Sequence, residues 1–187
     1  MHPRLIRSPH RRSGPGFTLI EMMVVIAIAA ILLTIGLPNL RDFLADQRVR
    51  TAASDLVSEI ALARARAIQD SRRVYFQRTA VDWKDGWIIF VDQNSNGAYD
   101  NGEEIKISQG LPGRLRICST VTDFGTNLIF RPDGRVVRTT AVGANDGLYL
   151  VDELGDTDPT NNKIRGLLFG TSGRVTTLKA NGVAPPC

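Results

Sequence analysis

Histidine is nearly absent from this chain of 187 residues, which contains only His2 and His10. Both lie before an apolar segment that begins at Phe17, so the rest of the sequence has none. That part of the chain therefore lacks an imidazole for general acid–base chemistry, for a serine–histidine–aspartate triad or for metal ligation. The sequence also has no glycine-rich phosphate loop and no metal-type cluster of cysteines. We therefore expect a protein that is not an enzyme.

The net charge of +4 has a local origin. The chain has 23 lysines and arginines against 19 acidic residues. Residues 1–16 contain no acid, and they carry four arginines, Arg4, Arg7, Arg11 and Arg12. From Phe17 onward the two signs are balanced, with 19 residues of each. The overall basic character is therefore weak evidence for a nucleic-acid partner.

The long apolar run from Phe17 to Leu37 contains one charged residue, Glu21. About 21 residues of helix are enough to cross a hydrocarbon core of roughly 30 Å. A carboxylate in such a segment costs about 2.5–3.5 kcal/mol on insertion scales, so it calls for a partner of opposite charge. The basic residues before the run resemble the start of an export signal.

The residues Gly16-Phe17-Thr18-Leu19-Ile20-Glu21 resemble the processing site of type IV pilins and of the pseudopilins of type II secretion. The resemblance implies that a prepilin peptidase cuts between Gly16 and Phe17, removes the leader of residues 1–16, and methylates the new N-terminal Phe17. It also implies that Glu21 pairs with the N-terminal amine of a neighbouring subunit, which sets the register of assembly. The alternative is an uncleaved signal anchor.

The helical pattern continues beyond the apolar run. We predict a membrane-spanning or filament-core helix over 17–37, a bend at Pro38 that also matters for assembly, and an amphipathic helical half over 38–70. The stripe expected to pack on a sheet is Leu56, Ile60, Ala63 and Ala67. The polar residues expected to face solvent or neighbouring subunits are Arg41, Asp42, Asp46, Arg48 and Arg50.

After Ser71 the pattern changes to short strands between turns, which predicts a β-rich globular domain over 71–187. A long helix followed by strands alone implies an α+β fold, with the helix laid on antiparallel sheet. Trp83 and Trp87 are interpreted as packing residues rather than a ligand-stacking pair. The expected strands are Val74–Gln77, Trp87–Val91, Glu104–Ile107, Leu115–Cys118, Leu128–Arg131, Arg135–Thr139, Leu148–Val151, Ile164–Phe169 and Arg174–Leu178.

Three further stretches resemble the GspH/FimT group of minor pilins and pseudopilins. They are Asp82-Trp83-Lys84-Asp85-Gly86-Trp87, Phe130-Arg131-Pro132-Asp133-Gly134-Arg135 and Phe169-Gly170-Thr171-Ser172-Gly173-Arg174-Val175. The resemblance implies a low-abundance subunit, held in the inner membrane with a periplasmic domain, that joins other pilins and helps to start or cap a filament. Some members of this group bind DNA during natural transformation.

The two cysteines, Cys118 and Cys187, fit an exported protein with one disulfide. Such a bridge would tie down the C-terminal tail. A closed loop of about 70 residues is worth about 4 kcal/mol in the chain-entropy model. The alternative is two free thiols.

Residues Asp92 to Glu103 match the calcium-loop pattern in full. Oxygen ligands would come from Asp92, Asn94, Asn96, Asp100 and Glu103, which are hard donors suited to Ca²⁺. The flanking segments are predicted strands rather than helices. The alternative is therefore a hairpin loop, rich in residues that tolerate turns, with no cofactor.

A DNA-binding surface requires exposed cations. The candidates are Lys163, Arg165, Arg174 and Lys179. The Gly-Arg-x-Arg motif of DNA-binding members is incomplete here, since Gly173-Arg174-Val175-Thr176 lacks the second arginine. The alternative is solvated arginines at hairpin ends. A second basic group is expected to contact acidic subunits or lipid headgroups: Arg64, Arg66, Arg72, Arg73 and Arg78.

Three functions therefore remain open from the sequence. The first is a structural minor type IV pilin, and the second is a minor pseudopilin of type II secretion. The third is a DNA-binding pilin for transformation.

Overall fold

The structure is a computed structural model that describes residues 16–119, 124–137, 147–152, 164–170 and 172–179. The chain divides into two compact units, Met1–Arg41 and Asp42–Cys187. One helix, α1 (Leu19–Gln69), contributes to both units. It is continuous through Pro38, and the predicted end near residue 70 is confirmed.

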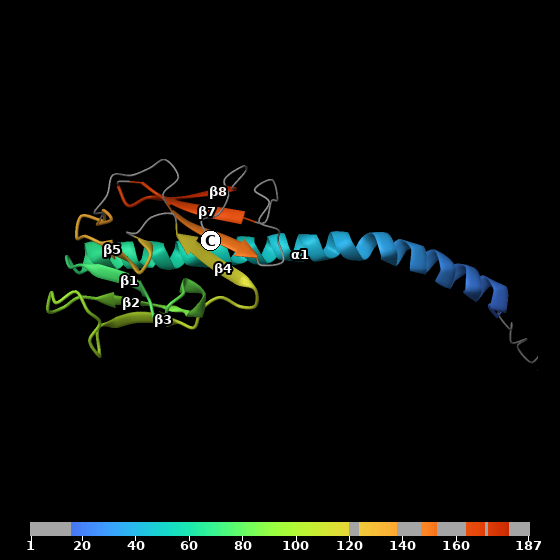
Figure 1. Cartoon of the computed structure of the whole chain (residues 1–187), viewed down its shortest axis with the longest axis horizontal. Helices are drawn as coiled ribbons and strands as arrows, with labels where there is room; N and C mark the ends of the chain where they lie inside the picture. Colours follow the sequence, from blue (N-terminus) through green and yellow to red (C-terminus); the bar gives the residue numbers. More distant parts are fainter. Residues whose placement is uncertain (1–15, 120–123, 138–146, 153–163, 171, 180–187) are drawn as a thin grey trace, which may run out of the picture. The chain divides into compact units, whose positions relative to one another are not determined.

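In the described part of the second unit, eight strands form two four-stranded antiparallel sheets (Figure 1). The first sheet has the order β3 (Glu104–Ser108), β2 (Trp87–Val91), β1 (Val74–Arg78), β5 (Asn127–Phe130). The second has the order β4 (Leu115–Ser119), β6 (Gly147–Asp152), β7 (Ile164–Phe169), β8 (Val175–Lys179). A short 3-10 helix, η1 (Trp83–Asp85), connects β1 and β2. The α+β prediction is confirmed.

One predicted strand is wrong in its described part. Residues 135–137 do not form a strand, and Val136 makes only a single bridge with Phe130. Two backbone hydrogen bonds flank this bridge: the amide of Arg131 donates to the carbonyl of Arg135 at 2.9 Å, and the amide of Val137 donates to the carbonyl of Ile129 at 2.8 Å. Residues 138 and 139 lie outside the described part of the chain.

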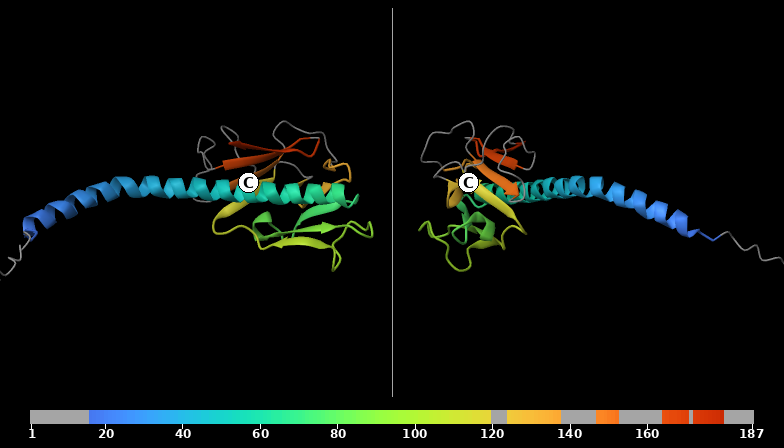
Figure 2. Two further views of the ribbon diagram at one scale, coloured as in Figure 1. Left: turned by 180° about the vertical axis from the view of Figure 1, so that it is seen from behind. Right: turned by 45° about the vertical axis from the view of Figure 1, so that its right-hand side comes forward.

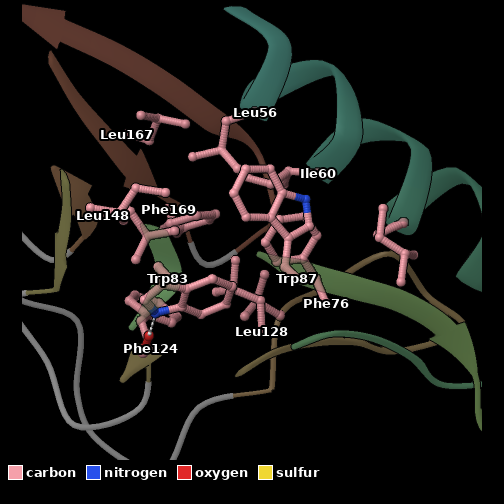
Figure 3. Close-up of a cluster of buried hydrophobic side chains, with 14 of the residues drawn as sticks. Leu56, Ile60, Phe76, Trp83, Trp87, Phe124, Leu128, Leu148, Leu167 and Phe169 are labelled. Carbon is pink, nitrogen blue, oxygen red and sulfur yellow. Dashed lines mark hydrogen bonds between the residues drawn. The ribbon is translucent and has the colours of Figure 1, made fainter. Parts of the chain in front are cut away.

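The second half of α1 lies along both sheets and shares one core with them (Figure 2). Its predicted stripe is buried, since Leu56 and Ile60 are each 1% exposed. Figure 3 shows that these two side chains pack near aromatic rings from both sheets, among them Trp87 of β2 and Phe169 of β7. Trp83 and Trp87 stack on Phe76 with ring centroids 5.5 and 5.8 Å apart, which confirms that the two tryptophans are packing residues.

Two hairpin turns, one from each sheet, meet at one end of this domain. A Cβ added to Gly173 would lie 2.1 Å from the carbonyl oxygen of Gly134, so the two backbones are in direct contact. Both glycines have positive φ, 76° and 77°. Arg64 of α1 joins the turns, because Nε donates to the Gly134 carbonyl at 3.0 Å and Nη2 to the Ser172 carbonyl at 3.1 Å. The helix therefore fastens both sheets together.

We expect Gly173→Ala to lower the free energy of unfolding by about 2 kcal/mol or more. The added methyl group would collide with the backbone of Gly134, and alanine would have to adopt a positive φ. Gly113→Ala is the control: its φ is 71°, but open space surrounds it. The free energy of unfolding of Gly113→Ala should fall by only about 1 kcal/mol, the cost of placing alanine in the left-handed backbone conformation. Urea unfolding measures both, and equal losses would contradict the close contact between the turns.

Candidate functional site

The side chain of Thr18 caps the N-terminus of α1. The amide of Glu21 donates to Oγ1 of Thr18 at 3.2 Å, one turn before it. This places Thr18 at the helix N-cap and Glu21 three residues later, where a negative charge interacts favourably with the helix dipole. The Thr-x-x-Glu spacing before an apolar run is a sequence signal of a helix start.

The first half of α1 exposes apolar side chains in every direction. Met22, Met23, Val24, Val25 and Ile26 are consecutive, and each is at least 50% exposed. Since successive residues turn by about 100° around a helix, these five cover its whole circumference. Phe17, 78% exposed, precedes the helix. Among the described residues, no helix is identified as a candidate membrane span.

Glu21 is exposed on this apolar helix. No lysine or arginine in the described part of the chain forms an ion pair with it. The predicted partner, the amine of a neighbouring subunit, therefore remains a prediction, as do cleavage after Gly16 and the role of Pro38.

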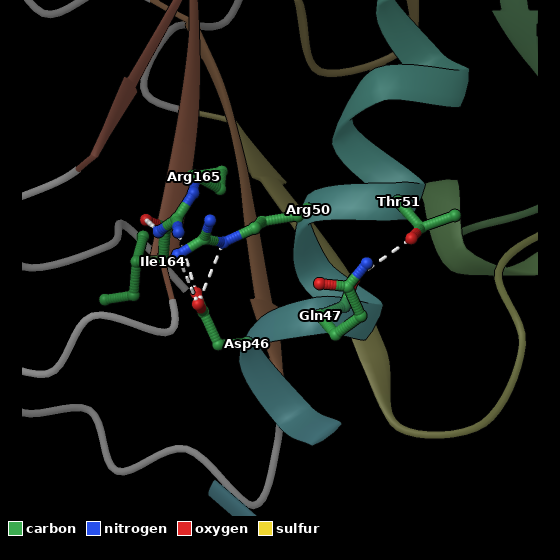
Figure 4. A network of polar contacts seen from close by, with 6 residues as sticks. All are labelled: Asp46, Gln47, Arg50, Thr51, Ile164 and Arg165. Carbon is green, nitrogen blue, oxygen red and sulfur yellow. Dashed lines mark hydrogen bonds and ion pairs between the residues drawn. The ribbon is translucent and has the colours of Figure 1, made fainter. Parts of the chain in front are cut away.

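A polar contact fastens α1 to the second sheet at the start of the domain (Figure 4). Nη2 of Arg165, on β7, lies 2.7 Å from Oδ1 of Asp46 on α1. Arg50, one turn along the helix, binds the other carboxylate oxygen at 2.6 Å. Arg165 is 9% exposed and also donates to the carbonyl of Ile164. Asp46 was expected to face solvent or neighbouring subunits, but it binds Arg165, which lies 119 residues later in the same chain.

The charge state of Asp46 follows from this contact. Partial burial raises its pKa, but the hydrogen bonds and positive charges of Arg50 and Arg165 outweigh burial and lower the pKa below its ordinary value of 3.8. Arg48 adds a second, longer contact to the same sheet, since its Nη1 lies 3.8 Å from Oδ2 of the buried Asp152.

The acidic loop after β2 is closed by its own hydrogen bonds. Asp92, 4% exposed, accepts from the amides of Asn96 and Gly97, both at 3.1 Å. Glu103, 7% exposed, accepts from the amides of Gln93 and Asp100. Both buried carboxylates therefore have backbone donors as partners.

The side-chain amides of Asn94 and Asn96 both donate to Oδ2 of Asp100 at 2.7 Å. Within the described residues, no three histidine, cysteine or acidic side chains are arranged to hold a metal ion. The hydrogen bonds from Asn94 and Asn96 to Asp100 hold the loop in its turn conformation. Calcium binding by this loop remains a prediction.

The same loop covers the outer face of the first sheet. Tyr99 packs edge-on against Phe90, with ring centroids 5.6 Å apart, and Phe90 stacks on Tyr75 at 5.0 Å. The hydroxyl of Tyr99 donates to Glu104, and this hydrogen bond raises the pKa of Tyr99. The pKa of Glu104 is lowered by its own backbone amide and then by Tyr99. The loop therefore has a packing role.

The described members of the predicted DNA-binding set, Arg165, Arg174 and Lys179, do not form one exposed tract. Arg165 is buried against Asp46, so its assignment to a phosphate-binding surface is wrong. Arg174 and Lys179 are exposed at opposite ends of the β8 hairpin arm. Lys163 lies outside the described residues. DNA binding through Arg174 and Lys179 remains a prediction.

Cys118 lies on β4 and is 8% exposed. It is disulfide-bonded rather than a free thiol, as the predicted bridge requires. Its predicted partner, Cys187, lies outside the described residues, so the pairing itself remains a prediction.

The apolar N-terminal helix begins shortly after Gly16-Phe17 and continues into a domain of two antiparallel sheets. This combination defines the class of pilin-like subunits. The chain belongs to the family described as Type II transport protein GspH, which residues 52–182 match. Residues 11–37 match the prokaryotic N-terminal methylation motif. The resemblance to type IV pilins and to the GspH group is confirmed.

Curated relatives carry pilin names. The chain is 34% identical to the pilin-like protein PilA1 of Thermus thermophilus over 125 residues, which are 64% of this chain and 77% of that protein. It is 39% identical over 138 residues to a fimbrial protein of Pseudomonas aeruginosa, covering 74% of this chain and 84% of the relative.

Solved structures show the same fold. Two crystal forms of the type IV minor pilin FimU of Pseudomonas aeruginosa superpose with TM-scores of 0.53 and 0.52, at 20% and 21% identity. They cover 77% and 73% of this chain and 97% of FimU. The prediction of a helix packed on antiparallel sheet is therefore confirmed for the pilin fold.

We expect Asp46→Asn to lower the free energy of unfolding by about 1–2 kcal/mol at pH 7, since it removes a carboxylate that binds the nearly buried Arg165. The native pKa of Asp46 is depressed, so its contribution is present above 3.8 and disappears as the pH falls through the native pKa. The difference between Asp46→Asn and the unmodified protein should therefore shrink in that acid range.

Asp133→Asn is the matched control. Asp133 pairs with Arg131 at 3.8 Å on an exposed turn, and such pairs contribute little. Denaturant melts at several pH values measure both variants. A loss for Asp46→Asn that does not change with pH would contradict the ionised pair.

Proposed function

We propose that this chain is a minor type IV pilin, a structural subunit that enters a filament and helps to start or cap its assembly. The observation that carries this proposal is the apolar surface on every side of α1 before Pro38, where Glu21 is the one charged residue. A helix that is apolar all round is stable when other helices or lipid cover it. Side chains of the Val, Leu and Phe class gain about 1.5–3 kcal/mol each when fully buried.

Glu21 distinguishes the two environments that suit this helix. In lipid the carboxylate is a penalty of about 2.5–3.5 kcal/mol. Beside the α-amine of a neighbouring Phe17 the same charge has a partner, and the penalty is offset. The carboxylate therefore favours a bundle of processed subunits over a helix left alone in the membrane.

The N-terminal events of the proposal rest on the methylation-motif match. Before assembly, a prepilin peptidase removes residues 1–16, and the apolar segment 17–37 holds the subunit in the inner membrane with its domain in the periplasm. The other pilins of the filament are its partners.

The second candidate is a minor pseudopilin of type II secretion. The description of the family that matches residues 52–182 favours it, whereas the names of the relatives favour a pilus. Both functions use the same N-terminal chemistry. A deletion strain separates them: loss of surface filaments with normal protein secretion supports the pilin, and the reverse supports the pseudopilin.

We expect Gly16→Leu to retain the leader, because the proposed cleavage site requires the small residue before Phe17. Mass spectrometry of the membrane-extracted protein measures the outcome. The chain that keeps Gly16 should begin at a methylated Phe17, whereas the Gly16→Leu variant should begin at its original N-terminus. Gly36→Leu is the control, since it adds the same side chain to a helical glycine with open space around it. An unmodified protein that keeps residues 1–16 would contradict the proposal.

We expect Glu21→Gln to be cleaved normally but to enter filaments about tenfold less, because it removes the charge that pairs with the neighbouring amine. Immunoblots of sheared filaments and of membranes measure the two pools. Asp55→Asn is the control, an exposed carboxylate lost from the same helix. Equal incorporation of Glu21→Gln and the unmodified subunit would rule out the pairing.

A further inference from the structure

A cleft of about 820 Å³ lies where α1 ends, and three segments that are distant in sequence line it. Ser71, Arg72 and Arg73 follow α1, Gln93 and Ser95 follow β2, and Arg131 follows β5. We propose that this cleft binds an oxyanion of the phosphate type. The proposal concerns the domain alone and is independent of the filament function.

The charge of the cleft is positive. Three arginines line it, and the acid that lines it with them is Asp92. Asp92 is buried, and each of its oxygens already accepts a backbone amide at 3.1 Å. Arg131 pairs with Asp133 only at 3.8 Å, with both side chains about half exposed. An exposed pair of this length is weak, so the three guanidinium groups retain capacity for an anion.

The walls of the cleft are held by hydrogen bonds. The guanidinium of Arg72 donates to the carbonyl of Gln93, which ties the end of α1 to the loop after β2. The carbonyl of Arg73 accepts the amide of Asp92 at 3.0 Å. Buried Glu103 accepts the amide of Gln93 at 2.8 Å. A preorganised frame of this kind lowers the entropic cost of binding.

Two strained serines provide a second observation, independent of charge. Among the described residues, Ser71 and Ser95 are the non-glycine residues with positive φ, at 52° and 64°. Both line this cleft. Glycine would adopt these conformations at no steric cost, whereas serine adds a hydroxyl donor. Strained residues cluster at functional sites, so their coincidence here points to a ligand.

The chemistry fits phosphate. Guanidinium groups match the oxygens of phosphate in bidentate geometry, and serine hydroxyls donate to the remaining oxygens. The competing explanation is that Arg72 and Arg73 offset the negative end of the helix dipole. That role affects stability and does not require the hydroxyl of Ser95 or the side chain of Arg131.

The test is isothermal calorimetry of the full chain in non-ionic detergent, titrated with inorganic phosphate. We expect saturable binding that falls at least about tenfold in the triple variant R72Q/R73Q/R131Q. The matched control R41Q/R114Q/R135Q removes the same charge from exposed positions outside the cleft and should stay within about twofold. Absence of phosphate binding by the unmodified chain, or equal weakening in both triple variants, would overturn the proposal.

Ser95→Gly separates binding from stability. We expect it to raise the melting temperature, because the strain is relieved, and to weaken phosphate binding, because a donor is lost. A higher melting temperature with unchanged affinity would contradict a ligand role for Ser95 and, with it, the argument from strain. A short single-stranded oligonucleotide identifies the source of the phosphate. Binding that R72Q/R73Q/R131Q abolishes indicates a nucleic-acid backbone, whereas binding of inorganic phosphate alone indicates a small phosphate compound.

Discussion

The apolar surface of α1 before the domain has no partner within the described chain, and the rest of the structure depends on this constraint. Met22 to Ile26 expose at least half of each side chain around a complete helical turn. Water is a poor solvent for such a surface, and burial of it favours association by about 25 cal/mol for each Å². A single carboxylate, Glu21, then restricts which associations are favourable, since it must meet a positive charge.

The second half of α1 is an integral part of the domain. The second half of α1 buries Leu56 and Ile60 against both sheets. Polar contacts at its two ends fix its position: Asp46 holds Arg165 of β7, and Arg64 holds the turns that follow β5 and β7. These contacts tie the second half of α1 to both sheets.

Local periodicity was sufficient to predict most of this fold. The strands between Val74 and Lys179 follow from short apolar runs between glycine-containing turns, and the end of α1 follows from its alternation of buried and polar residues. The pair of Asp46 and Arg165 was not predictable, because 119 residues separate its members and either one alone reads as a solvated charge. The loop from Asp92 to Glu103 matched a metal pattern because turn geometry and calcium ligation favour the same residues.

The most direct test of the account is a structure of a filament that contains this subunit. The account predicts that the segment from Phe17 to Leu37 is enclosed by helices of neighbouring subunits. It also predicts that the carboxylate of Glu21 lies within about 4 Å of a neighbour's N-terminal amine, the limit for an ion pair. A filament in which this segment remains in contact with lipid or solvent, or in which Glu21 has no cationic partner, would contradict it.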